Sequence, residues 1–258
     1  MAGELREWGA VTADELARIV VLSPHFDDAV LGCGRLLAAH PGATVLTVFA
    51  GAPDRFPDPM TWWDQLAGFE PDDDPLDARR KEDSKALAEL GAEPIRLDFV
   101  EHQYLSREDR ARPATIVDEL EAAIRRVDPT MVVAPFGLAN PDHDCTHEAA
   151  LLVRERLPEP AWFCYEDAGY KHIPGLLAWR VARLFRSGVW PTPAVMPVAG
   201  DAAEKDTALS HYASQLRALE ADWQLSAKLA APEQYWRLAP PPTGWERLAE
   251  IPIASEEG

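Results

Sequence analysis

The sequence predicts an α/β protein with a Rossmann-like fold, a doubly wound, mostly parallel β-sheet with helices on both faces. Short runs of β-branched and apolar residues alternate with longer amphipathic stretches, which is typical of parallel strands joined by helices. The chain has 258 residues, of which 47% are hydrophobic and 26% charged, and this suits a protein with a sizeable core. Because no internal repeat is visible, we expect residues 1–258 to form a single domain.

The strands are predicted from short apolar runs that are bounded by turn-forming residues. The first is Arg18–Ser23, a run rich in isoleucine and valine that ends at Pro24. Similar runs indicate strands at Thr44–Ala50, Ile95–Val100, Met131–Pro135 and Ala161–Tyr165, with a further candidate at Val195–Val198.

The helices are predicted from amphipathic stretches with recognisable ends. Gly91 stops the charged helix Asp77–Leu90, and Asp128-Pro129 closes the helix Ala114–Val127. The remaining helices are expected at Ala29–His40, Cys145–Leu157, Leu176–Arg186 and Ala202–Leu219.

Two segments show neither pattern. Residues 51–75 are rich in proline and aspartate and contain Trp62 and Trp63. Loops of this length are uncommon unless they serve a function, so we expect a long active-site loop. Residues 232–258 are rich in proline and charge, and we expect an irregular C-terminal tail.

Charge and the N-terminal residues narrow the class of partner. The formal net charge of −18 argues against binding to nucleic acids or anionic membranes, because both present phosphates. Met1–Ala10 lacks the pattern of a signal peptide, and no apolar run reaches the roughly 18 residues of a membrane helix. The three cysteines form neither a disulfide framework nor a CxxC pair. We expect a cytoplasmic protein that acts on a small molecule.

Two polar segments, Ser23–Asp28 and Asn140–His147, follow the first and the fourth predicted strands. In an open parallel sheet, ligands bind beyond the carboxyl ends of the strands, where the strand order reverses. In the order 3-2-1-4-5, strands one and four flank that point. We therefore expect the two segments to meet at one crevice.

The histidines and aspartates of these segments are of the type that binds zinc. A catalytic zinc keeps three protein ligands and one open position for water. His25 and Asp28 lie three residues apart at a strand-to-helix turn, and His143 would complete the set. Asp27 is then a free carboxylate that can take a proton from water. Each segment alone also has an ordinary explanation, as a helix cap or a turn, but their joint placement favours a metal site.

The same residues carry a resemblance to a known family. Pro24–Ala29 followed by Leu31–Gly34 resembles the PHxDD-x-x-LGCGG signature of the PIG-L/LmbE-like metal-dependent deacetylases. Further matches follow in order, namely Arg79 and Glu82 with an R-x-x-E helix, Pro135–His143 with the second motif, and Tyr165–Asp167 with a YED segment.

This resemblance implies a zinc-dependent hydrolase that removes an N-acyl group, chiefly N-acetyl, from an amino sugar or a related glycoconjugate. It implies that His25, Asp28 and His143 bind one Zn²⁺, or another divalent metal, per chain. It also implies that Asp27 is the general base.

Asn140 departs from the family pattern, which usually has histidine at this position. Asparagine can donate a hydrogen bond to an oxyanion but cannot supply a proton. Three alternatives follow, namely slower catalysis with Asn140 at the oxyanion, His147 as the substitute acid, or a metal-binding protein that binds a carbohydrate without turnover. His147 lies one helical turn after His143 and is also an alternative ligand.

Four further residues have both a binding and a structural explanation. Arg79 either pairs with Glu82 on the helix surface or contacts substrate hydroxyls. His102 follows the third strand and is expected to line the crevice. Trp62 and Trp63 either stack on a sugar or an acyl chain or pack on the surface.

A dinucleotide-binding function is disfavoured, because the first strand-to-helix turn carries two carboxylates in place of a G-x-G-x-x-G pattern.

Overall fold

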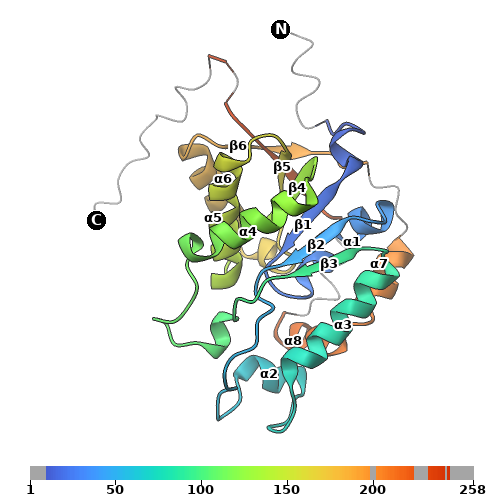
Figure 1. Cartoon of the computed structure of the whole chain (residues 1–258), viewed down its shortest axis with the longest axis vertical. Helices are drawn as coiled ribbons and strands as arrows, with labels where there is room; N and C mark the ends of the chain where they lie inside the picture. The colour runs from blue at the N-terminus through green and yellow to red at the C-terminus, as the bar shows by residue number, and fades with distance from the viewer. Residues whose placement is uncertain (1–9, 198–201, 224–231, 242, 245–258) are drawn as a thin grey trace.

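A twisted sheet forms the centre of the protein (Figure 1). The computed structural model describes residues 10–197, 202–223, 232–241 and 243–244. Its seven strands lie in the order β3-β2-β1-β4-β5-β7-β6. Pairing is parallel from β3 to β5, and β7 pairs antiparallel with both of its neighbours. The strands are β1 (Ile19–Ser23), β2 (Thr44–Thr47), β3 (Glu93–Arg96), β4 (Met131–Pro135), β5 (Ala161–Tyr165), β6 (Trp190–Ala194) and β7 (Tyr235–Ala239).

Helices cover both faces of the sheet (Figure 1). One core cluster contains side chains of α1, α3 and α7, and the other contains side chains of α4, α5 and α6. The short helix α2 packs against α8. The helices are α1 (Asp28–Ala39), α2 (Trp62–Ala67), α3 (Pro75–Glu89), α4 (Pro113–Val127), α5 (Pro141–Arg156), α6 (Leu176–Arg186), α7 (Ala202–Leu209) and α8 (Ala213–Trp223).

The central strand β1 explains why its sequence is continuously apolar. Val20 and Leu22 point into the α4–α5 core, whereas Ile19 and Val21 point into the α1 core. Every residue of β1 is buried. A strand that is covered on both faces needs apolar side chains at all positions, as parallel sheets generally do. The predicted α/β fold and the 3-2-1-4-5 order are therefore confirmed.

The predicted strands after β1 shift at their ends. β2 stops at Thr47, because the chain beyond it makes only single bridges, from Phe49 to Asp98 and from Gly51 to Val100. The third strand occupies residues 93–96, earlier than expected, so most of the predicted range lies in the loop towards the site.

Two helix predictions needed correction. The helix expected at residues 202–219 is divided into α7 and α8. At the break Tyr212 is fully buried, and its hydroxyl lies 3.1 Å from both the Asp83 carboxylate and the Phe26 carbonyl. Helix α5 begins at Pro141, four residues before the predicted start, because Asn140 caps it and proline suits the first helical position.

The two segments expected to be irregular both contain regular structure. Residues 51–75 include α2, which Thr61 caps by accepting a hydrogen bond from the Asp64 amide at 3.1 Å. The tail contributes β7, whose pairing with β5 and β6 could not be foreseen from a local pattern.

Two further predictions fall partly on residues that are not described. The strand proposed for 195–198 is wrong for residues 195–197, because β6 lies just before them, and Val198 is outside the described residues. The stretch 1–9 is outside them as well. Within the described part of the chain, no helix is both long and apolar enough to cross a membrane.

Candidate metal centre and active-site cavity

The first half of the site is the turn between β1 and α1. Ser23 Oγ accepts a hydrogen bond from the Ala29 amide at 2.9 Å, which ties the end of the strand to the first turn of the helix. The Asp28 carboxylate accepts a hydrogen bond from the His25 amide at 2.9 Å. Asp27 occupies the N-cap position without making a capping hydrogen bond. The simple helix-cap explanation of the aspartate pair therefore does not hold for Asp27.

The second half is the first turn of α5, which follows β4. Gly137 precedes it with φ at +73°, a backbone conformation that glycine adopts without strain. A Cβ atom at this position would lie 2.6 Å from His147 Cβ and 2.9 Å from the His143 carbonyl oxygen. The glycine thus lets the loop approach α5 closely and holds His143 at the end of the sheet.

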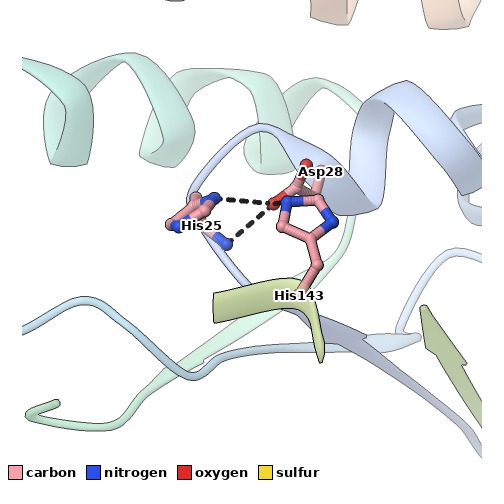
Figure 2. A group of neighbouring side chains, drawn as sticks. All are labelled: His25, Asp28 and His143. Atoms are coloured by element: carbon pink, nitrogen blue, oxygen red, sulfur yellow. Dashed lines mark hydrogen bonds and ion pairs between the residues drawn. The ribbon is translucent and has the colours of Figure 1, made fainter. Parts of the chain in front are cut away.

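Three side chains from these two segments meet at one point (Figure 2). The Asp28 Oδ2 atom lies 3.2 Å from His25 Nδ1 and 3.2 Å from His143 Nε2. The ligand atoms of the three residues all lie within 4.8 Å of one another, and within the described residues no other group of histidines, cysteines and carboxylates does so. Two imidazoles and one carboxylate are a donor set of catalytic zinc sites, so the residues fit the ion.

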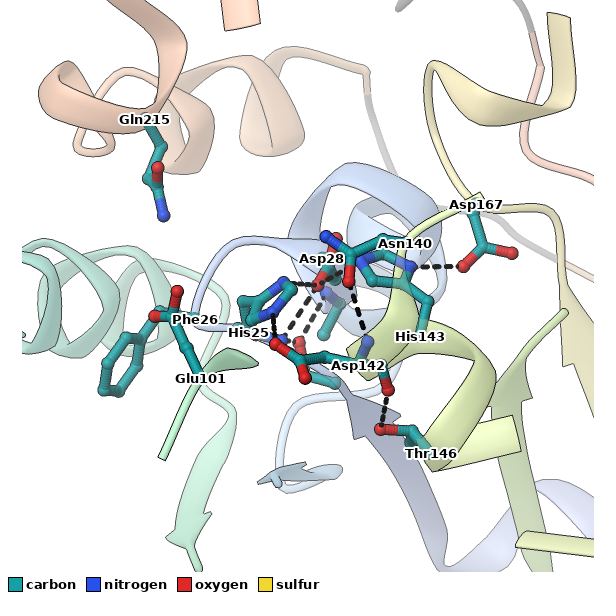
Figure 3. A network of polar contacts seen from close by, with 12 residues as sticks. His25, Phe26, Asp28, Glu101, Asn140, Asp142, His143, Thr146, Asp167 and Gln215 are labelled. Carbon is teal, nitrogen blue, oxygen red and sulfur yellow. Dashed lines mark hydrogen bonds and ion pairs between the residues drawn. The ribbon is translucent and has the colours of Figure 1, made fainter. Parts of the chain in front are cut away.

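The outer nitrogens of both histidines contact carboxylates (Figure 3). His25 Nε2 lies 3.0 Å from Asp142 Oδ2, and His143 Nδ1 lies 2.5 Å from Asp167 Oδ1. With the outer nitrogens as donors, the inner nitrogens keep lone pairs that could bind an ion held between them and Asp28. This is how carboxylates orient metal-binding histidines.

The adjacent carboxylates Asp27 and Asp28 differ in acidity. Burial, together with the charge of Asp28, raises the pKa of Asp27 to about 7. Burial alone would also raise the pKa of Asp28, but His143 and His25 hold it well below its usual range. Because the environments push the two values apart, Asp28 suits a ligand and Asp27 suits an acid or base.

A cavity of about 700 Å³ opens above the cluster. His25, Asp27, Asp28 and His143 line it, together with Asn140 and His102. Trp62 and Trp63 line it as well, and apolar atoms make up most of the lining. The volume is in the range of sites for drug-sized ligands.

The structure brings most of the predicted site residues to this cavity. Trp62 is 60% exposed, whereas Trp63 donates a hydrogen bond to Gln215 on α8 at 3.1 Å. His102 lines the cavity from the loop after β3, as expected. Asn140 lines it too, but its side-chain oxygen caps α5 by accepting from the Asp142 amide at 2.8 Å.

Arg79 does not lie where either sequence-based explanation put it. Its side chain is completely buried, pairs with Asp64 at 2.6 Å and donates to the Tyr104 hydroxyl at 2.9 Å. Glu82 instead accepts hydrogen bonds from Ser214. Arg79 therefore links α3 to α2, a pairing that spacing within one helix cannot reveal.

His147 also lies outside the cavity lining. It is fully buried, and its Nδ1 donates to the Pro135 carbonyl at 2.8 Å. Burial, with a smaller effect of Arg180, lowers the pKa of His147 to about 3. It is therefore a neutral histidine of the core, and the geometry supports neither the alternative ligand nor the substitute acid.

Sequence reasoning gave no role to Asp142, Asp167 or Tyr170. The ring of Tyr170 packs edge-on against His143, with centroids 5.3 Å apart. Asp142 and Asp167 stand inside quoted motifs, and the rule that metal-binding histidines contact carboxylates would have singled them out.

The fold and the site define a class of protein, a mostly parallel α/β protein with a His–Asp–His cluster of the catalytic zinc type at the carboxyl ends of the central strands. Residues 20–153 match the sequence model of PIG-L, described as GlcNAc-PI de-N-acetylase. This is more than half of the chain, so the protein belongs to the PIG-L family of deacetylases. A comparison with curated proteins found no match.

Solved structures of deacetylases are similar along most of the chain. The A40926 pseudoaglycone deacetylase Dbv21 is 30% identical, with a TM-score of 0.71 over 86% of this chain and 97% of that one. The zinc-inhibited form of the teicoplanin deacetylase Orf2 is 25% identical, with a TM-score of 0.70 over 88% of this chain and 100% of that one.

A third similar structure shows only the fold. It is the 4-carboxy-2-hydroxymuconate hydratase of Pseudomonas putida KT2440, 17% identical, with a TM-score of 0.54 over 87% of this chain and 97% of that one. Because it is named for a different reaction, the activity of the present chain has to be argued from its site.

Proposed function

We propose that the protein is a zinc-dependent N-deacetylase that hydrolyses the N-acyl amide of an amino sugar within a larger glycoconjugate. The observation that carries the proposal is the cluster of His25, Asp28 and His143 at the cavity wall, with the free carboxylate of Asp27 beside it. Family membership and the deacetylase structures support the same reaction class.

The roles of the residues follow from their contacts. His25, Asp28 and His143 would hold the ion, which when bound lowers the pKa of a water molecule and polarises the amide carbonyl. Asp27 accepts the proton of the attacking water, since its raised pKa of about 7 allows it to gain and lose a proton near neutrality. The Asn140 amide can donate a hydrogen bond to the developing oxyanion.

The cavity supports a substrate that is larger than a single sugar. Its walls are mostly apolar, and two tryptophans are among the residues that line it. Aromatic rings stack on sugar faces and on apolar groups. Similar solved structures are complexes of a deacetylase with teicoplanin and with bog, which supports a cavity for a large glycoconjugate. We expect an N-acetylated amino sugar attached to an apolar or aromatic group.

A substrate screen tests this function. The purified chain is stripped of metal, reloaded with zinc or left bare, and incubated with N-acylglucosamine and its alkyl and aryl glycosides. We expect zinc-dependent release of a primary amine, faster for glycosides with an apolar group than for the free sugar. Equal release with and without zinc would contradict the proposal.

Asn140 motivates a second candidate, a metal-bound carbohydrate-binding protein without turnover. Its oxygen is engaged as a helix cap, and an amide supplies no proton. This candidate is favoured if the zinc-loaded chain binds the glycosides in a calorimeter but releases no amine from any of them.

A further inference from the structure

Amide cleavage raises a requirement that Asn140 does not meet. The carbon–nitrogen bond breaks readily only when the departing nitrogen receives a proton. The Asn140 side chain has no acidic proton to give. Tyr170 also lines the cavity, but a phenol, whose ordinary pKa is about 10, gives up a proton less readily than an imidazolium.

Among the described residues that line the cavity, one imidazole is not part of the metal cluster. His102 lines the cavity, and 24% of its side chain is exposed. Its Nδ1 lies 2.9 Å from Asp142 Oδ2, and its backbone amide donates to the same oxygen at 3.0 Å. One carboxylate oxygen therefore holds both the ring nitrogen Nδ1 and the backbone amide of His102, and within the described residues no hydrogen bond to its Nε2 is found.

Asp142 links this imidazole to the metal cluster. The same Oδ2 atom contacts His25 Nε2 at 3.0 Å (Figure 3). His102 and His25 therefore share one acceptor. Asp142 therefore orients both rings and places its carboxylate directly beside the His102 imidazole.

Histidines that transfer protons in hydrolases have one imidazole nitrogen fixed by a carboxylate and the other available for proton transfer, and His102 at the cavity wall has the first of these contacts. From the proposed deacetylase function and this arrangement, we propose that His102, oriented by Asp142, donates the proton to the leaving amine from its Nε2 atom. It would do so in place of an acid at Asn140.

The step is balanced as follows. Water oxygen bonds to the carbonyl carbon while Asp27 takes one water proton. The carbon–nitrogen bond then breaks, and the amine nitrogen takes a proton from His102 Nε2. The acid product keeps the other water proton, and the proton on Asp27 returns through solvent to His102.

The substitution His102→Asn tests this role, because the asparagine NH₂ can replace Nδ1 as a donor to Asp142 while no group replaces Nε2. We expect unchanged zinc content and thermal stability, an unchanged KM, and a kcat that falls roughly 10²–10⁴-fold on the best N-acetyl glycoside. The matched control is His40→Asn, at the far end of α1 and outside the cavity lining, which we expect to leave kcat unchanged.

Two further measurements separate proton donation from a structural role. With 4-nitrophenyl acetate, whose leaving group departs without a proton, His102→Asn should retain wild-type activity. In His102→Gly, added imidazole should restore part of the amidase activity.

The outcomes that overturn the proposal are distinct from those that overturn the function. If His102→Asn keeps full amidase activity, the proton is recycled by Asp27 and the proposal is wrong. If its activity falls equally on both substrates, His102 has a positioning role and the proposal is also wrong. A wild-type chain that releases no amine overturns the deacetylase function, and this proposal with it.

Discussion

At the scale of single residues, the adjacent residues Asp27 and Asp28 have the same side chain but different surroundings. Asp28 lies 3.2 Å from two imidazoles, whereas Asp27 lies at the N-cap position and makes no capping hydrogen bond. This geometry is the basis on which we propose Asp28 as a metal ligand and Asp27 as the general base.

This difference predicts the behaviour of Asp27→Asn. The variant should bind zinc as the wild type does, because Asp27 is not a ligand, but kcat should fall roughly 10²–10⁴-fold through loss of the base. Zinc content and amine release measured on one preparation check this. Loss of the metal, or an unchanged kcat, would show that the assignment is wrong.

His147 leads to a prediction about acid stability. Burial lowers its folded pKa from 6.5 to about 3, so the folded chain excludes a proton that the unfolded chain accepts. Its contribution is fully present above pH 6.5 and is lost as the pH falls towards 3, by roughly 1.4 kcal/mol per pH unit.

Urea unfolding of metal-free wild type and His147→Gln between pH 6.5 and 4.5 measures this contribution. Asp27 and Asp83 also titrate in that range, but they are common to both chains and cancel in the difference. As the pH falls, the free energy of unfolding should decrease less steeply for His147→Gln than for the wild type. The difference in slope should correspond to the uptake of about one proton on unfolding. If the free energies of unfolding of the two proteins change equally with pH, His147 is protonated in the folded state.

Sequence could indicate the ligands but not their surroundings. His25, Asp28 and His143 stand in spaced motifs after strands, and spacing is what a sequence displays. The contact between His25 and Asp142 spans 117 positions, and the Arg79–Asp64 pair joins two helices. Such contacts follow from packing, so Arg79 was interpreted incorrectly.

At the scale of elements, helix α2 carries the two tryptophans that line the cavity. The segment was expected to be a structureless loop, yet it forms a capped helix, and Trp63 connects it to α8 through Gln215. The two tryptophans therefore have different tasks, since Trp62 is exposed and Trp63 is anchored.

We predict that Trp62→Ala raises KM for apolar glycosides while kcat changes little, because the exposed ring contacts only the distant part of the substrate. An effect of about 1–2 kcal/mol corresponds to roughly a 5–30-fold rise. Steady-state kinetics on a glycoside with an apolar aglycone and on the free sugar measure it. Equal KM changes for both substrates would argue against aglycone contact.

At the scale of the whole molecule, the topology creates the site. Strands β1 and β4 are neighbours in the sheet, although more than a hundred residues separate them. Their parallel pairing brings Ser23 and Pro135 to the same edge, and the chain after each strand supplies part of the cluster. The order of strands β1 to β5 was predictable because helices alternate with these strands along the chain. The antiparallel extension by β7 and β6 was not, because its pairing depends on distant segments.

The central claim is that the three residues at this edge bind the metal on which hydrolysis depends. The most direct test loads wild type, Asp28→Ala and His143→Ala with zinc and measures bound zinc and released acetate in the same samples. We predict one zinc per chain and acetate release for the wild type, and loss of both in each variant. Full zinc occupancy in both variants would contradict the account.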